Sequence, residues 1–141
     1  DDNTNSTPTA TTKSDVPNPA IVPEKMMGWL SKEGHVVKSW KSRYFVMENG
    51  ILIYYVNPQL DPPYGVTEKG KLYLHEYFLI KGFTGKENRS IMLSHRDNAT
   101  KDLLLEADTT LIRDDWEKSL TLHIEHGVYI HKSRKNFINI S

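Results

Sequence analysis

Short apolar runs separated by turn residues occupy most of the chain from Met26 onward. The runs are rich in β-branched and aromatic residues, which favour strands, and Asn49-Gly50 between two of them is a strong β-hairpin signal. The pattern predicts seven strands, at Met26–Lys32, Trp40–Met47, Ile51–Val56, Lys71–His75, Phe78–Phe83, Ser90–His95 and Asp102–Ala107.

A helical period replaces the strand pattern near the end of the chain. Four apolar residues recur at every fourth position and form one stripe: Ile112, Trp116, Leu120 and Ile124. Thr109 or Thr110 can cap the start and Gly127 is placed to end the helix, so we predict one helix of about 16 residues. The seven strands and one helix indicate a mainly β fold, an antiparallel barrel or sandwich capped by a C-terminal α-helix.

The first residues have a different composition from the rest. Residues 1–24 hold four of the seven prolines and no aromatic residue, so they have little apolar surface to bury on folding. We therefore expect a disordered Pro/Thr/Ser-rich linker at 1–24, a folded domain at 25–128 and a short basic C-terminal tail at 129–141. Such a linker suggests that the chain is part of a longer protein.

Composition narrows the classes of function. The 18 basic side chains balance 18 acidic ones, which argues against a nucleic-acid coat. The absence of Cys excludes disulfides, thiolate catalysis and zinc ribbons. No run reaches the ~18 apolar residues of a membrane span, so we expect any membrane contact to be peripheral.

Several segments together resemble the pleckstrin homology (PH) domain family: Gly28-Trp29-Leu30 with Lys32, Trp40 to Val46, Ile51 to Tyr55, and Arg113 to Trp116. The resemblance covers residues 26 to about 127 and implies a seven-stranded PH-type barrel or sandwich with one C-terminal helix. It also implies a binding module. No catalytic motif stands out, so we expect no enzyme activity from this chain and no cofactor.

PH domains that bind phosphoinositide head groups tightly resemble one another in a basic pattern, which this sequence meets in full. The pattern has Lys on the first strand, a variable gap, and then Lys or Arg, any residue, Arg, any residue and two hydrophobic residues. Here it corresponds to Lys32, Lys41, Arg43 and Phe45-Val46. The resemblance also implies a hydroxyl from the third strand, with Tyr54 the better-phased match and Tyr55 the alternate. A fourth-strand cation is implied as well, at Lys69 or Lys71.

The residues themselves support a site for an anion. Alternation along a strand places Lys41 and Arg43 on the same face as Phe45, and Lys32 comes from the neighbouring strand. Like charges held this close repel, so the arrangement favours a bound anion such as a phosphorylated inositol. A solvated basic face, or a docking patch for an acidic protein, is the alternative interpretation.

The segment between the first two predicted strands extends the candidate site. His35 and Lys38 join the phosphoinositide-binding residues, and Val36 and Val37 form a candidate membrane-contact loop, unless they pack on their own hairpin. If His35 lies near phosphates, their charge raises its pKa and lipid affinity should increase as the pH falls through the range of about 6–7.

Charge is unevenly distributed along the chain. Residues 30–44 carry four basic and one acidic side chain, whereas residues 101–126 carry three basic and seven acidic ones. One end of the domain would then face an anionic surface and the helix would point away from it.

Other sites are weaker candidates. His123 and His126 could share a metal on the helix, near Glu125 and His131, but a third helical ligand in register is missing, so we expect no metal site. Single-stranded nucleic acid is the last-ranked ligand, because the aromatic residues are better placed for a core. We therefore expect no nucleic-acid partner.

The sequence thus predicts a phosphoinositide-binding module that recruits its parent protein to a cytoplasmic membrane leaflet. Its partners would be phosphoinositide lipids or inositol phosphates and an anionic membrane surface, with a protein as a further candidate partner. The alternative is a protein–protein interaction module on the same fold without specific lipid binding.

Overall fold

The computed structural model describes residues 18–34, 39–59, 61–80 and 88–140. These ranges hold the predicted series of seven strands followed by a helix, together with one short 3-10 helix, η1. The elements are β1 (Met26–Glu33), β2 (Trp40–Glu48), β3 (Ile51–Tyr55), β4 (Glu68–Tyr73), η1 (Leu74–Glu76), β5 (Tyr77–Leu79), β6 (Ser90–His95), β7 (Leu103–Glu106) and α2 (Thr110–Ile140).

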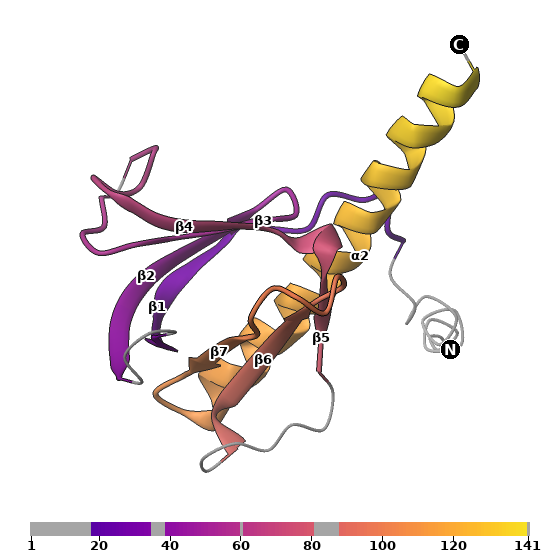
Figure 1. Ribbon diagram of the computed structural model, residues 1–141. Helices are drawn as coiled ribbons and strands as arrows, with labels where there is room; N and C mark the ends of the chain where they lie inside the picture. The colour runs from indigo at the N-terminus through magenta and orange to yellow at the C-terminus, as the bar shows by residue number, and fades with distance from the viewer. Residues whose placement is uncertain (1–17, 35–38, 60, 81–87, 141) are drawn as a thin grey trace, which may run out of the picture.

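All seven strands belong to one antiparallel sheet with the order β4-β3-β2-β1-β7-β6-β5. Strand β1 pairs with β2 along its whole length but with β7 only at Ser31 and Lys32. The sheet bends at this short contact into two parts, β1 to β4 and β5 to β7, and α2 packs against it (Figure 1). The predicted capped barrel or sandwich is therefore confirmed as a curled sheet with one C-terminal helix.

The core fills the inner face of the curled sheet, which is the face that contacts α2. Phe45 on β2 is fully buried and meets the ring of Trp116 edge-on, with 6.4 Å between ring centroids. Gly28 on β1 lies against the same indole, since a Cβ there would be in ordinary contact with it at 3.5 Å. Burying an aromatic side chain of this kind contributes about 1.5–3 kcal/mol or more, so Trp116 anchors the helix on the sheet.

The helix is longer than predicted: it spans 31 residues, passes through Gly127 and includes most of the segment that we expected to be a short basic tail. The turn at Gly50 packs closely on the helix here, because a Cβ on Gly50 would lie 3.3 Å from the Cα of Gly127. At the other end, Thr109 is the cap, since its hydroxyl accepts a hydrogen bond from the Ile112 amide at 3.1 Å. The last turns of α2 lead away from the sheet (Figure 1).

Residues 18–24, the described part of the predicted linker, lie along α2 and are held by two buried histidines. His126 donates from Nδ1 to the Pro19 carbonyl at 2.8 Å, and His123 donates from Nε2 to the Glu24 carbonyl at 2.9 Å. The rest of the predicted linker, residues 1–17, lies outside the described residues. Within the described ranges, no helix has the length and apolar character that crossing a bilayer requires.

Candidate functional site

Lys32, Lys41 and Arg43, which we call the cation cluster, lie on the inner face of the sheet at the end of the β1–β2 pair. Lys32 and Lys41 are directly opposed across the two strands, and Arg43 is opposed to the buried Leu30. Phe45 follows on the same face and enters the core. The structure therefore brings the three basic side chains of the sequence pattern together at the edge of the core.

The cation cluster has no counter-ion of its own within the described residues, where none of the three side chains forms an ion pair. Arg43 donates one hydrogen bond to the Ser42 carbonyl at 2.9 Å, and Lys32 lies 3.3 Å from the Glu33 carbonyl. Partial burial, followed by the charge of Arg43, holds the pKa of Lys32 below its usual value. A bound anion would offset the repulsion from Arg43 and favour the charged form of Lys32.

Tyr54 adds a hydroxyl to the same face. Its ring packs against Phe45 with 5.1 Å between centroids, and the Lys32 ammonium lies 5.4 Å above the ring centroid. Burial raises the pKa of Tyr54, an effect that the nearby charge of Arg43 partly offsets, so the phenol keeps its proton and can donate to an anion. Tyr55 is buried on the outer face of the sheet, so Tyr54 is the third-strand tyrosine that accompanies the cation cluster.

The two lysines of β4 differ in how the strand places them. Lys71 borders the outer face: it is opposed to Ile53 and its ammonium lies 5.9 Å from the centre of the Tyr73 ring. Lys69 is exposed at the bulge where β4 shifts register, one residue before Gly70. Lys69 is the extra residue of this bulge, between Glu68 opposite Tyr55 and Gly70 opposite Tyr54, so strand alternation does not fix the direction of its side chain.

Four predicted site residues, His35, Val36, Val37 and Lys38, lie outside the described residues. The strand ends on either side are joined by a hydrogen bond from the Gly34 amide to the Ser39 carbonyl at 3.0 Å. The connecting segment therefore starts beside the cation cluster, and its ligand and membrane contacts stay predictions.

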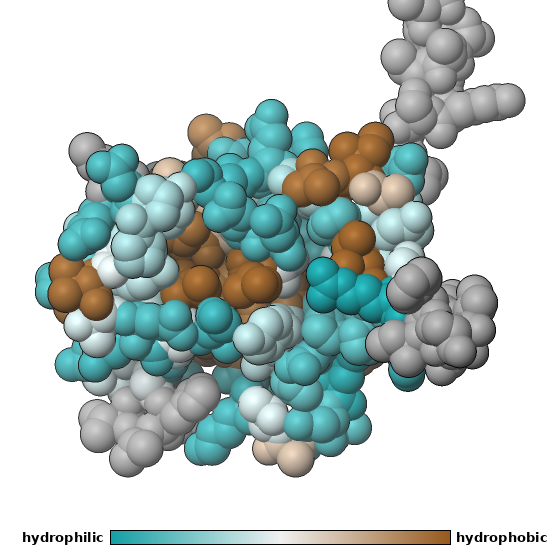
Figure 2. Space-filling model, turned by 90° about the horizontal axis from the view of Figure 1, so that it is seen from above, coloured by the Kyte–Doolittle hydropathy of each residue, from teal (hydrophilic) through white to brown (hydrophobic). Residues whose placement is uncertain are grey.

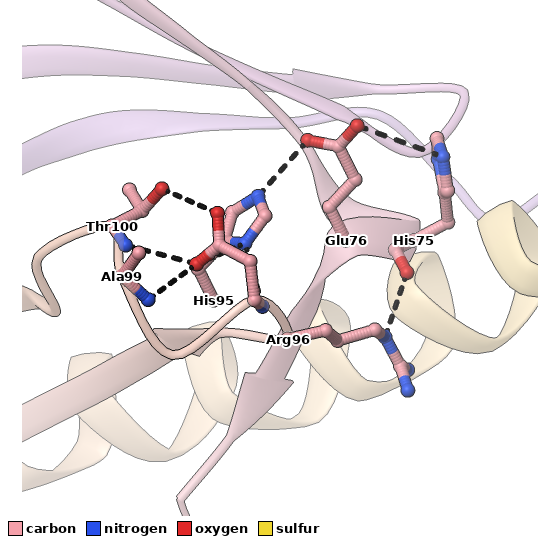
Figure 3. Close-up of polar contacts among 7 residues, drawn as sticks. His75, Glu76, His95, Arg96, Ala99 and Thr100 are labelled. Carbon is pink, nitrogen blue, oxygen red and sulfur yellow. Dashed lines mark hydrogen bonds and ion pairs between the residues drawn. The ribbon is translucent and has the colours of Figure 1, made fainter.

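A second polar group lies where η1 and the β6–β7 turn meet α2, and sequence patterns did not indicate it. Glu76 is 3.3 Å from His95, and Arg96 donates from Nε to the His75 carbonyl at 2.8 Å (Figure 3). Backbone hydrogen bonds from Thr100 and Ala99 hold the pKa of Asp97 at about 2. These contacts of mixed sign join the β6–β7 turn to η1, so their role is structural.

The helical histidines also have structural roles. His123 accepts a hydrogen bond at Nδ1 from the Gly50 amide at 3.2 Å while donating from Nε2 to Glu24, which uses both ring nitrogens. His131 stacks on His75 with 4.3 Å between ring centroids. In the described part of the chain, no group of three or more side chains is arranged to hold a metal ion.

Comparison with known proteins identifies the fold by sequence as well as by shape. Residues 24–125 match the family model described as the PH domain. Pleckstrin-2 of Mus musculus is 29% identical over 103 residues, and the match covers 71% of this chain. The chain spans only 28% of the length of that relative.

Two solved structures illustrate the structural likeness. The PH domain of human oxysterol binding protein-related protein 11 has a TM-score of 0.62 at 23% identity, over 76% of this chain and 85% of that one. The C-terminal PH domain of pleckstrin, solved in complex with D-myo-Ins(1,2,3,5,6)P5, has a TM-score of 0.56 at 23% identity, over 74% and 97% of the two chains. At such identities the likeness shows the fold.

Proposed function

Because this chain belongs to the PH domain family, we propose that its cation cluster binds the phosphorylated head group of a phosphoinositide and thereby recruits the parent protein to a cytoplasmic membrane leaflet. The domain that members of this family have in common is a binding module and not a catalytic one. The cation cluster and Tyr54 would be the ligand-binding residues, with His35, Lys38 and Lys69 as further contacts and Val36 and Val37 as the membrane-contact loop.

The observation that carries the proposal is the cation cluster itself. Two lysines and one arginine from paired strands share one face without an ion pair among the described residues, and the ring of Tyr54, with its hydroxyl protonated, lies against the Lys32 ammonium. Arg43 can bind a phosphate through two parallel hydrogen bonds, whereas the lysines act as point charges. The inositol pentakisphosphate in the complex with the pleckstrin domain is a ligand of the same chemical class.

The direct test is co-sedimentation of the protein with phosphatidylcholine vesicles that contain or lack individual phosphoinositides. We expect Lys41→Ala and Arg43→Ala to weaken phosphoinositide-dependent binding by about tenfold to a hundredfold, because each removes a charge-assisted contact of roughly 1.5–3 kcal/mol. Lys71→Ala is the matched control, since it removes a β4 lysine from the outer face. Equal losses in all three variants, or none, would contradict the proposal.

A protein-interaction role is the second candidate, and the outer face of the sheet is the feature that favours it. Apolar side chains line a hollow of about 300 Å³ there, including Ile51, Ile53 and Pro62-Pro63. Figure 2 shows apolar side chains gathered within a hydrophilic border when the molecule is viewed from above. A protein partner whose binding survives Arg43→Ala but is lost in Ile53→Asp would support this second role.

A further inference from the structure

Tyr54 lies across the backbone of β4 at Gly70. The two residues are opposed in the β3–β4 register, and Gly70 is the residue next to the bulge. A Cβ added to Gly70 would overlap the outer end of the Tyr54 ring, at Cζ and the hydroxyl oxygen. The ring can therefore occupy this position only while residue 70 has no side chain.

The remaining surroundings of the ring leave it little freedom. Phe45 covers one side at 5.1 Å between centroids with an interplanar angle of 33°, and the Lys32 ammonium lies 5.4 Å from the ring centroid. With Gly70 beneath the phenol end, these contacts fix the direction of the ring, and the charge of Arg43 is close enough to the hydroxyl to offset part of the rise in its pKa. The ring is partly buried, and the resulting rise in its pKa keeps the hydroxyl protonated.

The next tyrosine offers a natural comparison on the other face of the sheet. Tyr55 is 4% exposed and packs over Gly65, where an added Cβ would overlap its ring at Cγ and Cδ2. Both consecutive tyrosines therefore pack over a glycine from the chain that follows β3. Only the Tyr54–Gly70 pair, however, belongs to the face that carries the cation cluster.

We propose that Gly70 is a positioning residue of the head-group site, which sets the Tyr54 hydroxyl so that it donates a hydrogen bond to a phosphate held by Lys32 and Arg43. The inference rests on the proposed function and deepens it. The contribution of β4 to the site is then the absence of a side chain at Gly70, which lets a hydroxyl reach the anion. This contact does not depend on a cation from Lys69.

The test is calorimetric titration with a soluble inositol pentakisphosphate. We expect Gly70→Ala and Tyr54→Phe each to weaken binding by about tenfold to a hundredfold, the effect of losing one charge-assisted hydrogen bond. Gly65→Ala is the matched control: it disturbs Tyr55 on the outer face, so its affinity should stay within about threefold of the wild type. Wild-type affinity in Gly70→Ala, or an equal loss in Gly65→Ala, would overturn the inference.

A second measurement separates this inference from the proposed function and from a folding defect. The phenol resonances of Tyr54 are followed by NMR as the pH is raised, without any ligand. Gly70→Ala should shift these resonances and lower the phenol pKa towards its usual value, whereas Gly65→Ala should shift those of Tyr55. Unchanged Tyr54 resonances in Gly70→Ala would refute the positioning role even if the wild type bound no inositol phosphate.

If Gly70→Ala does not fold, the double variant Tyr54→Ala/Gly70→Ala decides the question. Removing the ring removes the overlap, so the double variant should show the cooperative unfolding transition that Gly70→Ala lacks. A double variant no more stable than Gly70→Ala would contradict the contact on which the inference depends.

Discussion

At the scale of single residues, the site combines charges that repel one another with an apolar base. Lys32 shows this most directly, because burial and the charge of Arg43 both lower its pKa. The charged form of this lysine is therefore less favourable here than in water. A bound anion would stabilise the charged form. Phe45 and Tyr54 supply the rigid surface beneath it.

His123 provides a test of the structure that is independent of any ligand. Its Nδ1 accepts from the Gly50 amide, so protonation would place a donor against a donor, and burial lowers the pKa of this histidine below its usual value. The unfolded chain therefore takes up this proton at a higher pH than the folded one. Stability should be complete above the unfolded pKa of about 6.5 and decrease as the pH falls below it.

We expect the free energy of unfolding to decrease between pH 6.5 and pH 5, by at most about 2 kcal/mol for one proton, as measured by urea denaturation. His123→Gln is the control, because glutamine does not titrate and should leave a smaller dependence on pH. Identical pH dependence in the two proteins would show that His123 is not the group responsible.

At the scale of the elements, the strands follow from local patterns and the end of the helix does not. Alternation places Lys41, Arg43 and Phe45 on one face, as the structure has them, because a strand fixes the direction of each side chain locally. Gly127 suggested a helix end, yet α2 continues through it and packs against the turn at Gly50, which lies far away in the sequence. Such a contact leaves no local signal.

The same limit applies to β4, where the bulge changes which side chains face the cation cluster. The register of β4 against β3 cannot be read from the sequence alone, so the sequence points to the β4 lysines, Lys69 and Lys71, as candidates for the site. An isolated glycine within a strand pattern is nevertheless a recognised sign of close approach by another group. Gly70 could have been noticed on that ground, although its partner Tyr54 could not.

Replacing Gly127 tests the course of the helix. A Cβ at this position would lie 3.4 Å from the His75 amide nitrogen and 3.5 Å from its Cβ, which is ordinary contact. Because alanine favours a helix interior by about 0.5–1 kcal/mol over glycine, Gly127→Ala should raise the free energy of unfolding by that amount. If the helix ended at Gly127, Gly127→Ala would instead lower the free energy of unfolding.

Gly50→Ala is the companion to this experiment. Gly50 has φ of +79°, and its Cβ would lie 3.3 Å from the Cα of Gly127, so this variant should lose stability. Opposite signs for the two alanine variants, measured by urea denaturation, would confirm the close packing of the hairpin turn on a continuous helix.

At the scale of the whole molecule, the distribution of charge differs from the simple polarity that the sequence suggested. The helix continues past His126 into residues 127–140, which carry three basic side chains and no acidic one. This basic end leads away from the sheet, on the side opposite to the free end of the β1–β2 pair (Figure 1). The two basic regions therefore face different directions.

Removing residues 132–141 should leave the proposed site intact. The stack of His131 on His75 is retained, and charges beyond a screening length of about 8 Å have little effect at physiological salt. We expect affinity for a soluble inositol pentakisphosphate to stay within about twofold of that of the full chain, by calorimetry. A large loss would show that the basic end of α2 takes part in binding.

The most direct measurement is a titration of the isotope-labelled protein with a soluble inositol pentakisphosphate, followed residue by residue by NMR. Binding at the cation cluster should shift the resonances of Lys32, Lys41, Arg43 and Tyr54 with one saturating curve. Those of Lys71 and of the helix beyond Gly127 should stay in place. Shifts confined to the helix end, or no shift at the cation cluster, would contradict a head-group site between β1, β2 and β3.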